Sequence, residues 1–136
     1  MPGWTLTEIG SSPTVSDGEP DDPVWHPLQH VLGIDTFGVN LLVATHADQI
    51  LVEEHDERTS GQQELYITMD GEAVFRLDGE EARLGRGSAL AITDPTVTRS
   101  ARAVVAGTAL LIVGASDRPF TSTWDAAHFA DIRQPE

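Results

Sequence analysis

The chain has 136 residues and contains no cysteine. It therefore has no disulfides, no thiolate metal sites and no cysteine nucleophile. Its longest purely apolar runs, such as residues 109–113, are far shorter than the roughly 20 residues that span a bilayer. The N-terminus, Met1-Pro2-Gly3-Trp4, lacks the basic-then-apolar pattern of a secretion signal. We therefore expect a cytoplasmic protein.

Positive charge is also scarce. The chain has 22 acidic residues against 8 basic ones, with no lysine among them, for a net charge of −14. A field of this sign repels nucleic acids and anionic membranes, so we expect neither as a partner. Apolar residues make up 40% of the chain, which together with its length predicts one folded domain.

The N-terminal part mixes several kinds of local signal. Apolar and polar residues alternate over Trp4–Ile9, which predicts a short strand. Proline, glycine and acidic residues crowd into Ser11–Pro23, which predicts a loop or surface arm. The segment 25–33 indicates one or two helical turns ended by Gly33.

After Gly33, short strand signals recur and turn signals such as Asp70-Gly71 and Asp78-Gly79 separate them. Many short strands with such turns predict an all-β antiparallel sandwich or barrel. Near the end of the chain, Trp124–Ala130 is typical of a short closing helix. The strands are expected at Thr36–Thr45, Gln49–Glu54, Glu64–Met69, Ala73–Leu77, Ala82–Leu84, Ser88–Thr93, Arg102–Val105 and Thr108–Val113.

Two stretches together carry a family resemblance. Glu64 and Gly71 form an E-x6-G pattern, a hairpin over Glu72–Asp78 follows it, and a glycine-led strand opens the stretch Gly85–Pro95. In this combination the chain resembles a small single-domain bacterial cupin with degenerate metal-binding motifs. The resemblance covers residues 33 to about 117, and Phe37-Gly-Val-Asn40 and Glu54-His-Asp-Glu57 are similar to an uncharacterised group of such proteins.

The resemblance implies a cupin-type double-stranded β-helix, which is a jelly-roll β-barrel with an internal pocket. Residues 33–136 would form this barrel with a C-terminal tail that includes a short helix. Residues 1–32 would supply a strand, an acidic loop and a short helical segment that pack on it. A homodimer is also implied.

The metal-binding motifs depart from the family pattern. The first cupin motif is usually H-x-H-x3–4-E, whereas here His55-Asp56-Glu57 gives H-x-E and six residues separate Glu57 from Glu64. In the second motif, Thr98 or Arg99 stands where the family has another histidine. The resemblance therefore carries a metal site over only in part, onto His55, Glu57 and Glu64.

Strand alternation predicts which side chains share a face. Glu64, Tyr66 and Thr68 lie on one face of their strand. If the preceding strand extends far enough, a second face carries Leu51, Glu53, His55 and Glu57. If both faces line the barrel, His55 meets the two glutamates and Tyr66 in one pocket. A histidine with two carboxylates suits Fe(II), Mn(II), Ni(II) or Zn(II).

Each candidate also has an ordinary structural interpretation. His55 is a metal ligand, an acid or base, or a rim histidine bonded to acidic neighbours. Glu57 is a ligand or a solvated loop carboxylate. A buried Glu64 needs a partner. Arg99 is either that partner, taking the place of a metal with its own charge, or a surface arginine in a turn.

Further polar residues are expected either in the pocket or at the surface. Tyr66 is a pocket donor or a wall aromatic, and the Asn40 amide needs a hydrogen-bond partner that a pocket can supply. Arg76 alternates with apolar neighbours, which predicts an outward side chain. The histidines in apparent loops or helix ends are expected at the surface, namely His26, His30, His46 and His128.

Three functions stay open. In the first, the protein binds a small organic molecule and performs acid–base chemistry of an isomerase or cyclase type. Its catalytic residues are Glu64, His55 and Tyr66, and its substrate-binding residues are Asn40, Arg99 and Thr68. In the second, a divalent transition metal on His55, Glu57 and Glu64 supports a dioxygenase. In the third, a non-catalytic dimeric sensing module covers Leu6, Val39 and Leu41 with a partner barrel.

Overall fold

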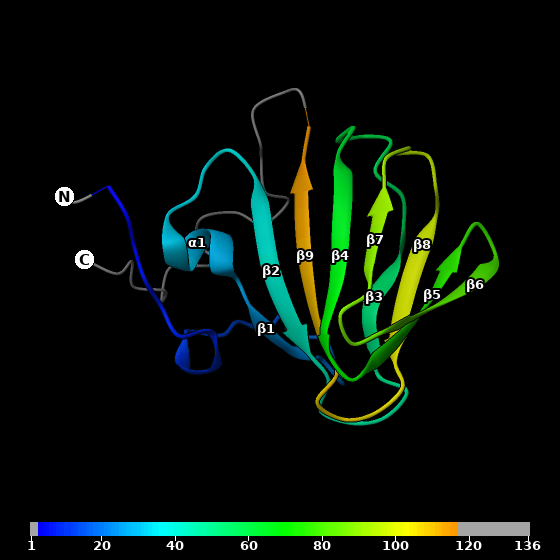
Figure 1. The fold of residues 1–136 in the computed structure, drawn as a ribbon, viewed down its shortest axis with the longest axis horizontal. Helices are drawn as coiled ribbons and strands as arrows, with labels where there is room; N and C mark the ends of the chain where they lie inside the picture. Colours follow the sequence, from blue (N-terminus) through cyan, green and yellow to red (C-terminus); the bar gives the residue numbers. More distant parts are fainter. Residues whose placement is uncertain (1–2, 117–136) are drawn as a thin grey trace.

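The computed structural model describes residues 3–116, and strands form most of the ordered elements (Figure 1). This confirms the all-β prediction. The elements are η1 (Ile9–Ser11, a 3-10 helix), β1 (Val24–His26), α1 (Leu28–Leu32), β2 (Gly38–Val43), β3 (Ile50–His55), β4 (Gln63–Asp70), β5 (Glu72–Leu77), β6 (Glu80–Gly85), β7 (Ala89–Ile92), β8 (Arg99–Ala103) and β9 (Ala109–Ala115).

The strands form two antiparallel sheets that pack face to face. Sheet A has the order β1-β2-β9-β4-β7, and sheet B has the order β3-β8-β5-β6. Strands that follow one another in the sequence therefore alternate between the sheets at several points, which is the jelly-roll arrangement that was expected. Among the described helices, none is long and apolar enough to cross a membrane.

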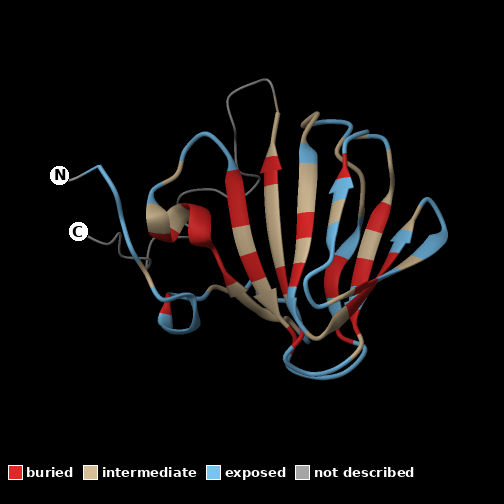
Figure 2. Ribbon diagram, in the orientation of Figure 1, coloured by how far each residue is buried: buried red, intermediate tan, exposed pale blue. Residues whose placement is uncertain are grey.

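The core lies between the sheets, where buried positions recur along the strands while the connecting loops are exposed (Figure 2). Sheet A contributes Tyr66 and Leu110, and sheet B contributes Phe75 and Ala101. The rings of Tyr66 and Phe75 meet edge to face with centroids 5.0 Å apart. This arrangement is favourable for aromatic pairs. The small Ala101 pairs in register with Phe75 and leaves room for these rings.

A second apolar cluster covers the outer face of sheet A. Leu28 of α1 packs with the buried Val39 and Leu41 of β2, and α1 lies beside β2 in Figure 1. The helix ends at Gly33, whose φ of 71° is the left-handed conformation that glycine favours, as predicted. The prediction that Val39 and Leu41 meet a partner barrel is wrong, because α1 of the same chain covers them. The dimer itself stays a prediction.

The N-terminal arm differs in part from the prediction. No strand forms over Trp4–Ile9, since η1 begins at Ile9 and no sheet edge pairs with the segment. Leu6 is 83% exposed, so the apolar residues of this alternating segment do not form a buried face. Residues 11–23 form the predicted loop. A bridge from Val15 to Trp25 and a 3.0 Å hydrogen bond from Gln49 Nε2 to the Asp21 carbonyl tie it down.

Strand positions after Gly33 are largely confirmed, with one clear shift. The strand predicted over Arg102–Val105 is β8, which begins at Arg99 and ends at Ala103. The short strand β1 was not predicted. The expected helix Trp124–Ala130 and His128 lie outside the described residues. The division of the chain at residue 33 stays a prediction.

Candidate functional site

Four chain segments meet at one end of the sandwich. His55 is the last residue of β3 and pairs with Arg99, the first residue of β8. Glu64 lies near the start of β4, opposite Gly114 near the end of β9. Glu57 lies in the loop between β3 and β4, where its N–H donates to the Pro95 carbonyl at 2.8 Å. Sheet register therefore brings together side chains far apart in the sequence.

The centre of this cluster is an ion pair between the two sheets. Arg99 Nη1 donates to Glu64 Oε1 at 2.8 Å, and the side chains are 0% and 10% exposed. The interpretation of Arg99 as a surface arginine in a turn is therefore wrong. Two of its guanidinium nitrogens, Nε and Nη2, are buried without a hydrogen-bond partner among the described residues. An unsatisfied buried donor costs about 1–3 kcal/mol, and more if charged.

Tyr66 is the second donor to the same carboxylate oxygen. Its hydroxyl lies 2.6 Å from Glu64 Oε1, and its side chain is almost completely buried. Burial and the adjacent Glu64 carboxylate raise the pKa of Tyr66 well above its ordinary value. The phenol therefore keeps its proton and holds Glu64 in place, so Tyr66 is both a wall aromatic and a polar donor.

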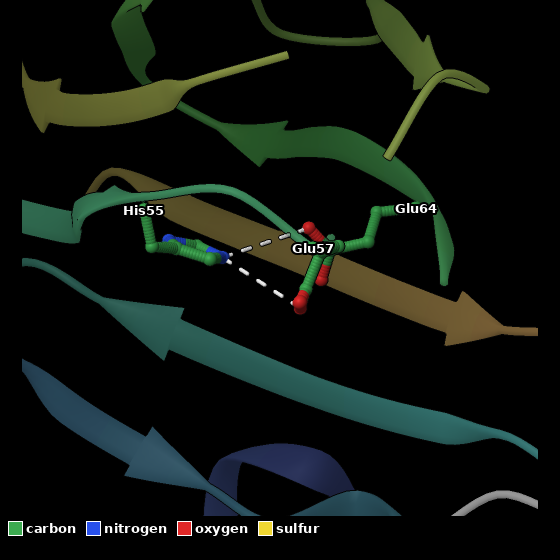
Figure 3. A group of neighbouring side chains, drawn as sticks. All are labelled: His55, Glu57 and Glu64. Atoms are coloured by element: carbon green, nitrogen blue, oxygen red, sulfur yellow. Dashed lines mark ion pairs between the residues drawn. The ribbon is translucent and has the colours of Figure 1, made fainter. Parts of the chain in front are cut away.

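His55 presents one ring nitrogen to both glutamates. Its Nδ1 lies 2.8 Å from the Glu53 carbonyl, which only accepts hydrogen bonds, so the Nδ1 proton is assigned there. Its Nε2 faces Glu57 Oε1 at 3.8 Å and Glu64 Oε1 at 3.9 Å (Figure 3). These distances exceed hydrogen-bond length, and they leave Nε2 open to take up a proton beside two carboxylates.

Glu57 is more enclosed than a solvated loop residue. Its side chain is 18% exposed, and Ser60 Oγ donates to its Oε2 at 3.2 Å. Burial, followed by repulsion from Glu64, raises its pKa above the ordinary value of 4.5. Two carboxylates therefore lie close to the His55 imidazole and the Arg99 guanidinium in one small region.

The three expected metal ligands do converge. Ligand atoms of His55, Glu57 and Glu64 all lie within 4.8 Å of one another. However, Glu64 Oε1 already accepts hydrogen bonds from Arg99 and Tyr66. A divalent ion on this oxygen would also be repelled by the guanidinium, 2.8 Å away. The donor set does not fit a three-ligand metal site while Arg99 is in place, and we derive no step through a metal.

The other predicted binding residues lie elsewhere inside the fold. Asn40 Oδ1 accepts a 2.8 Å hydrogen bond from Trp25 Nε1, which supplies the partner that its amide needs. Thr68 is fully buried on the inner face of β4, and its hydroxyl has no hydrogen-bond partner among the described residues. Within residues 3–116, no hydrogen bond or ion pair joins either residue to the Arg99–Glu64 pair.

The predicted face along β3 is wrong in part. Register shifts interrupt the pairing of β3 with β8, so Leu51 and Val52 are both buried and Glu53 is exposed. A bulge places two successive residues on the same side and breaks strict alternation. His55 still reaches the site because the shift occurs before the end of the strand.

Two of the histidines that were expected at the surface differ in their burial. His46 is exposed and bonds to Asp21, which raises its pKa. His26 is instead 5% exposed, so its predicted surface position is wrong. Its Nδ1 lies 3.0 Å from Ser12 Oγ, and burial lowers its pKa. Arg76 is exposed on sheet B, as predicted.

A cavity of about 560 Å³ opens beside this cluster. The N-terminal arm forms one wall, Trp25 and Leu42 form the base, and β3 forms the other wall up to His55. Five of its lining residues are acidic and none is lysine or arginine: Asp17, Asp21, Asp22, Glu53 and Glu54. Sequence reasoning missed this wall, because no local signal places residues 15–23 against β3.

His55 connects the cavity to the buried pair. It lines the cavity, and its Nε2 lies 3.9 Å from the Glu64 oxygen that Arg99 holds. The imidazole is 38% exposed, whereas Arg99 is not exposed at all. A molecule in the cavity can therefore contact His55, whereas Glu57, Glu64 and Arg99 do not line the cavity.

No family model matches this chain, and no curated protein matches it by sequence. Solved structures do match its fold. A cupin protein from Bacteroides fragilis is 17% identical with a TM-score of 0.66, and the match covers 91% of this chain and 93% of that one. A sugar phosphate isomerase from a cupin superfamily, from Silicibacter pomeroyi, is 18% identical with a TM-score of 0.68, covering 89% and 83%. KdgF from Halomonas sp. is 16% identical with a TM-score of 0.59, covering 76% and 86%.

Proposed function

The chain has the cupin fold, and from this premise we propose that it binds a small organic molecule beside His55 and moves a proton on it, in an isomerase-type reaction. The observation that carries the proposal is the position of His55, which lines the cavity and whose Nε2 faces two carboxylates. A solved structure with the same fold is described as a sugar phosphate isomerase, which supports this reaction class.

His55 acts as the general base in this proposal. Its Nδ1 hydrogen bond to the Glu53 carbonyl fixes the ring, and Nε2 receives the proton. The substrate carbon beside a carbonyl loses that proton, and the C–H electron pair moves toward the carbonyl oxygen. In a hydroxycarbonyl substrate, the hydroxyl on the deprotonated carbon then passes its proton to this oxygen, and return of the first proton from His55 to the former carbonyl carbon completes the isomerisation. Negative charge on Glu57 and Glu64 stabilises the imidazolium that exists between the two transfers.

Tyr66 and Arg99 have a positioning role toward Glu64. Both donate to its Oε1, so the carboxylate stays at the edge of the imidazole and cannot rotate away without losing two hydrogen bonds. Glu64 in turn acts on the substrate through His55. The two carboxylates thereby orient and stabilise one base, as in other sites where a carboxylate supports a histidine.

A solvent-exchange experiment tests the proposal. The protein is incubated in deuterium oxide with small hydroxyketones and hydroxyaldehydes, and 1H NMR follows deuterium at the carbon beside the carbonyl. We expect exchange by the native chain and a loss of about 100-fold or more in His55→Gln, the usual range for a general base. Glu64→Gln should also lose exchange, and a cooperative thermal unfolding transition, at a lower temperature because the buried Arg99 loses its anion, shows that the variant is folded.

His30→Gln is the matched control, because His30 lies on α1 at the outer face of sheet A. It should exchange at the native rate. Equal exchange in His55→Gln and the native protein would contradict the assignment of the base. Binding without exchange, for every compound that binds, would contradict proton transfer and favour a non-catalytic binding module.

A further inference from the structure

The guanidinium of Arg99 has one hydrogen-bonding edge without a partner. Nη1 donates to Glu64, whereas Nε and Nη2 are buried with no hydrogen-bond partner among the described residues. In a guanidinium group, the Nε–H and one Nη2–H are parallel, and together they form the fork that binds two acceptor atoms at once. The open edge of Arg99 is therefore the edge suited to a pair of oxygens.

The charge around Arg99 decides what kind of oxygen pair fits. Glu64 already balances its positive charge, and the Glu57 carboxylate lies within 4.8 Å of the ligand atoms of Glu64 and His55. The cavity that His55 lines carries five acidic residues and no lysine or arginine. A phosphate or carboxylate would add negative charge to this region, whereas a neutral hydroxycarbonyl supplies two neighbouring acceptors without it.

We propose that the Nε/Nη2 edge of Arg99 binds two adjacent oxygens of a neutral α-hydroxycarbonyl substrate. This inference rests on the proposed function and names the substrate class for the same site. The substrate enters from the cavity that His55 lines, and the imidazole, which is 38% exposed, stays in place next to Arg99, with which His55 pairs across β3 and β8. Arg99 is then a catalytic residue, because its fork stabilises the negative charge that grows on the carbonyl oxygen as His55 removes the proton.

NMR of the arginine Nε–H groups tests the fork directly. The native protein is labelled with 15N, the Arg99 Nε–H signal is assigned by correlation to its backbone, and dihydroxyacetone is added. We expect this signal to shift and its exchange with water to slow. Sodium glycolate and glycerol 3-phosphate, at the same concentrations, should leave it unchanged. The titration uses the native chain, so it does not depend on the folding of any variant.

A variant pair measures how much the fork contributes to binding. Arg99→Lys keeps a positive charge but has no bidentate edge, and we expect it to weaken dihydroxyacetone binding by about 10- to 100-fold. Arg86→Lys, in the exposed turn between β6 and β7, is the matched control and should bind as the native chain does. Thermal unfolding of both variants shows whether each is folded.

The outcomes separate this inference from the proposed function. An Arg99 signal that none of the three compounds alters, or that responds to glycolate or glycerol 3-phosphate alone, overturns it. Deuterium exchange that continues at the native rate in a folded Arg99→Lys overturns it while leaving His55 as the base. Binding at the fork without deuterium exchange sustains the site and contradicts the proton transfer instead.

Discussion

Two arginine–glutamate pairs in this molecule use the same groups in opposite ways. On the surface of sheet B, Arg83 donates Nε and Nη2 to the two oxygens of Glu72 at 3.1 and 3.0 Å. Between the sheets, Arg99 donates only Nη1 to Glu64 and keeps its fork open. In the exposed pair the fork of the arginine has both of its acceptors. In the buried pair the fork lacks acceptors, although a buried donor without a hydrogen-bond partner is costly.

The difference indicates that the buried pair has a role other than stability. In a surface ion pair both charges stay in contact with water, so the pair contributes little to the free energy of folding. In a buried pair, the attraction between the charges must offset the loss of hydration of both. A hydrophobic pair of similar volume often gives a more stable protein. Arg99 also orients the carboxylate that faces His55. This is the role that the proposed function gives it.

The largest expected effect comes from removing each arginine in turn. Arg99→Gln leaves Glu64 buried without its cation, so we expect the free energy of unfolding to fall by about 3–5 kcal/mol. Arg83→Gln should leave it unchanged within error, because both partners are solvated. Urea unfolding at pH 7 measures both. Equal small losses would show that the buried pair is no different from the exposed one.

A smaller, pH-dependent effect concerns Glu57. Its folded-state pKa is raised above 4.5 by burial and by Glu64, so its contribution to stability is fully present below pH 4.5. That contribution is lost as the pH rises through the folded-state pKa. Glu57→Gln cannot ionise, so we expect the variant to gain stability relative to the native chain as the pH rises from 4 to 7.

Thermal unfolding across this pH range measures the Glu57 effect. Glu80→Gln, at an exposed position of β6, is the control and should follow the native curve. A difference between Glu57→Gln and the native chain that stays constant with pH would mean that Glu57 does not titrate under the influence of its burial and of Glu64.

Much of the fold was predictable because the strands have local signals. Alternation and glycine turns located β2 to β7 and β9, and the alternation in β4 correctly placed Glu64, Tyr66 and Thr68 on the inner face. The start of β8 was missed because its inward residues are Arg99 and alanines rather than bulky apolar residues. Alanine is the right size there only because the ring of Phe75 on the neighbouring strand and the ring of Tyr66 from the other sheet fill the core.

The site was predictable where one strand determines it and unpredictable where packing between distant segments does. Arg99 as the partner of Glu64 was one of the two interpretations that its position in the second motif left open. By contrast, the bulge in β3 and the arm that walls the cavity depend on tertiary contacts, such as Gln49 with Asp21. The strand predicted over Trp4–Ile9 did not form, although the local signal was present. The alternating residues there have no second element to pack on.

The metal content of the protein, purified without chelators, tests the central claim most directly. If the Arg99 guanidinium takes the place of a metal ion at Glu64, elemental analysis of the native chain should show far less than one transition metal per chain. Folded Arg99→Gln, in which His55, Glu57 and Glu64 are free to bind together, should take up added zinc. One tightly bound metal per native chain, lost on substitution of His55 or Glu57, would contradict the account.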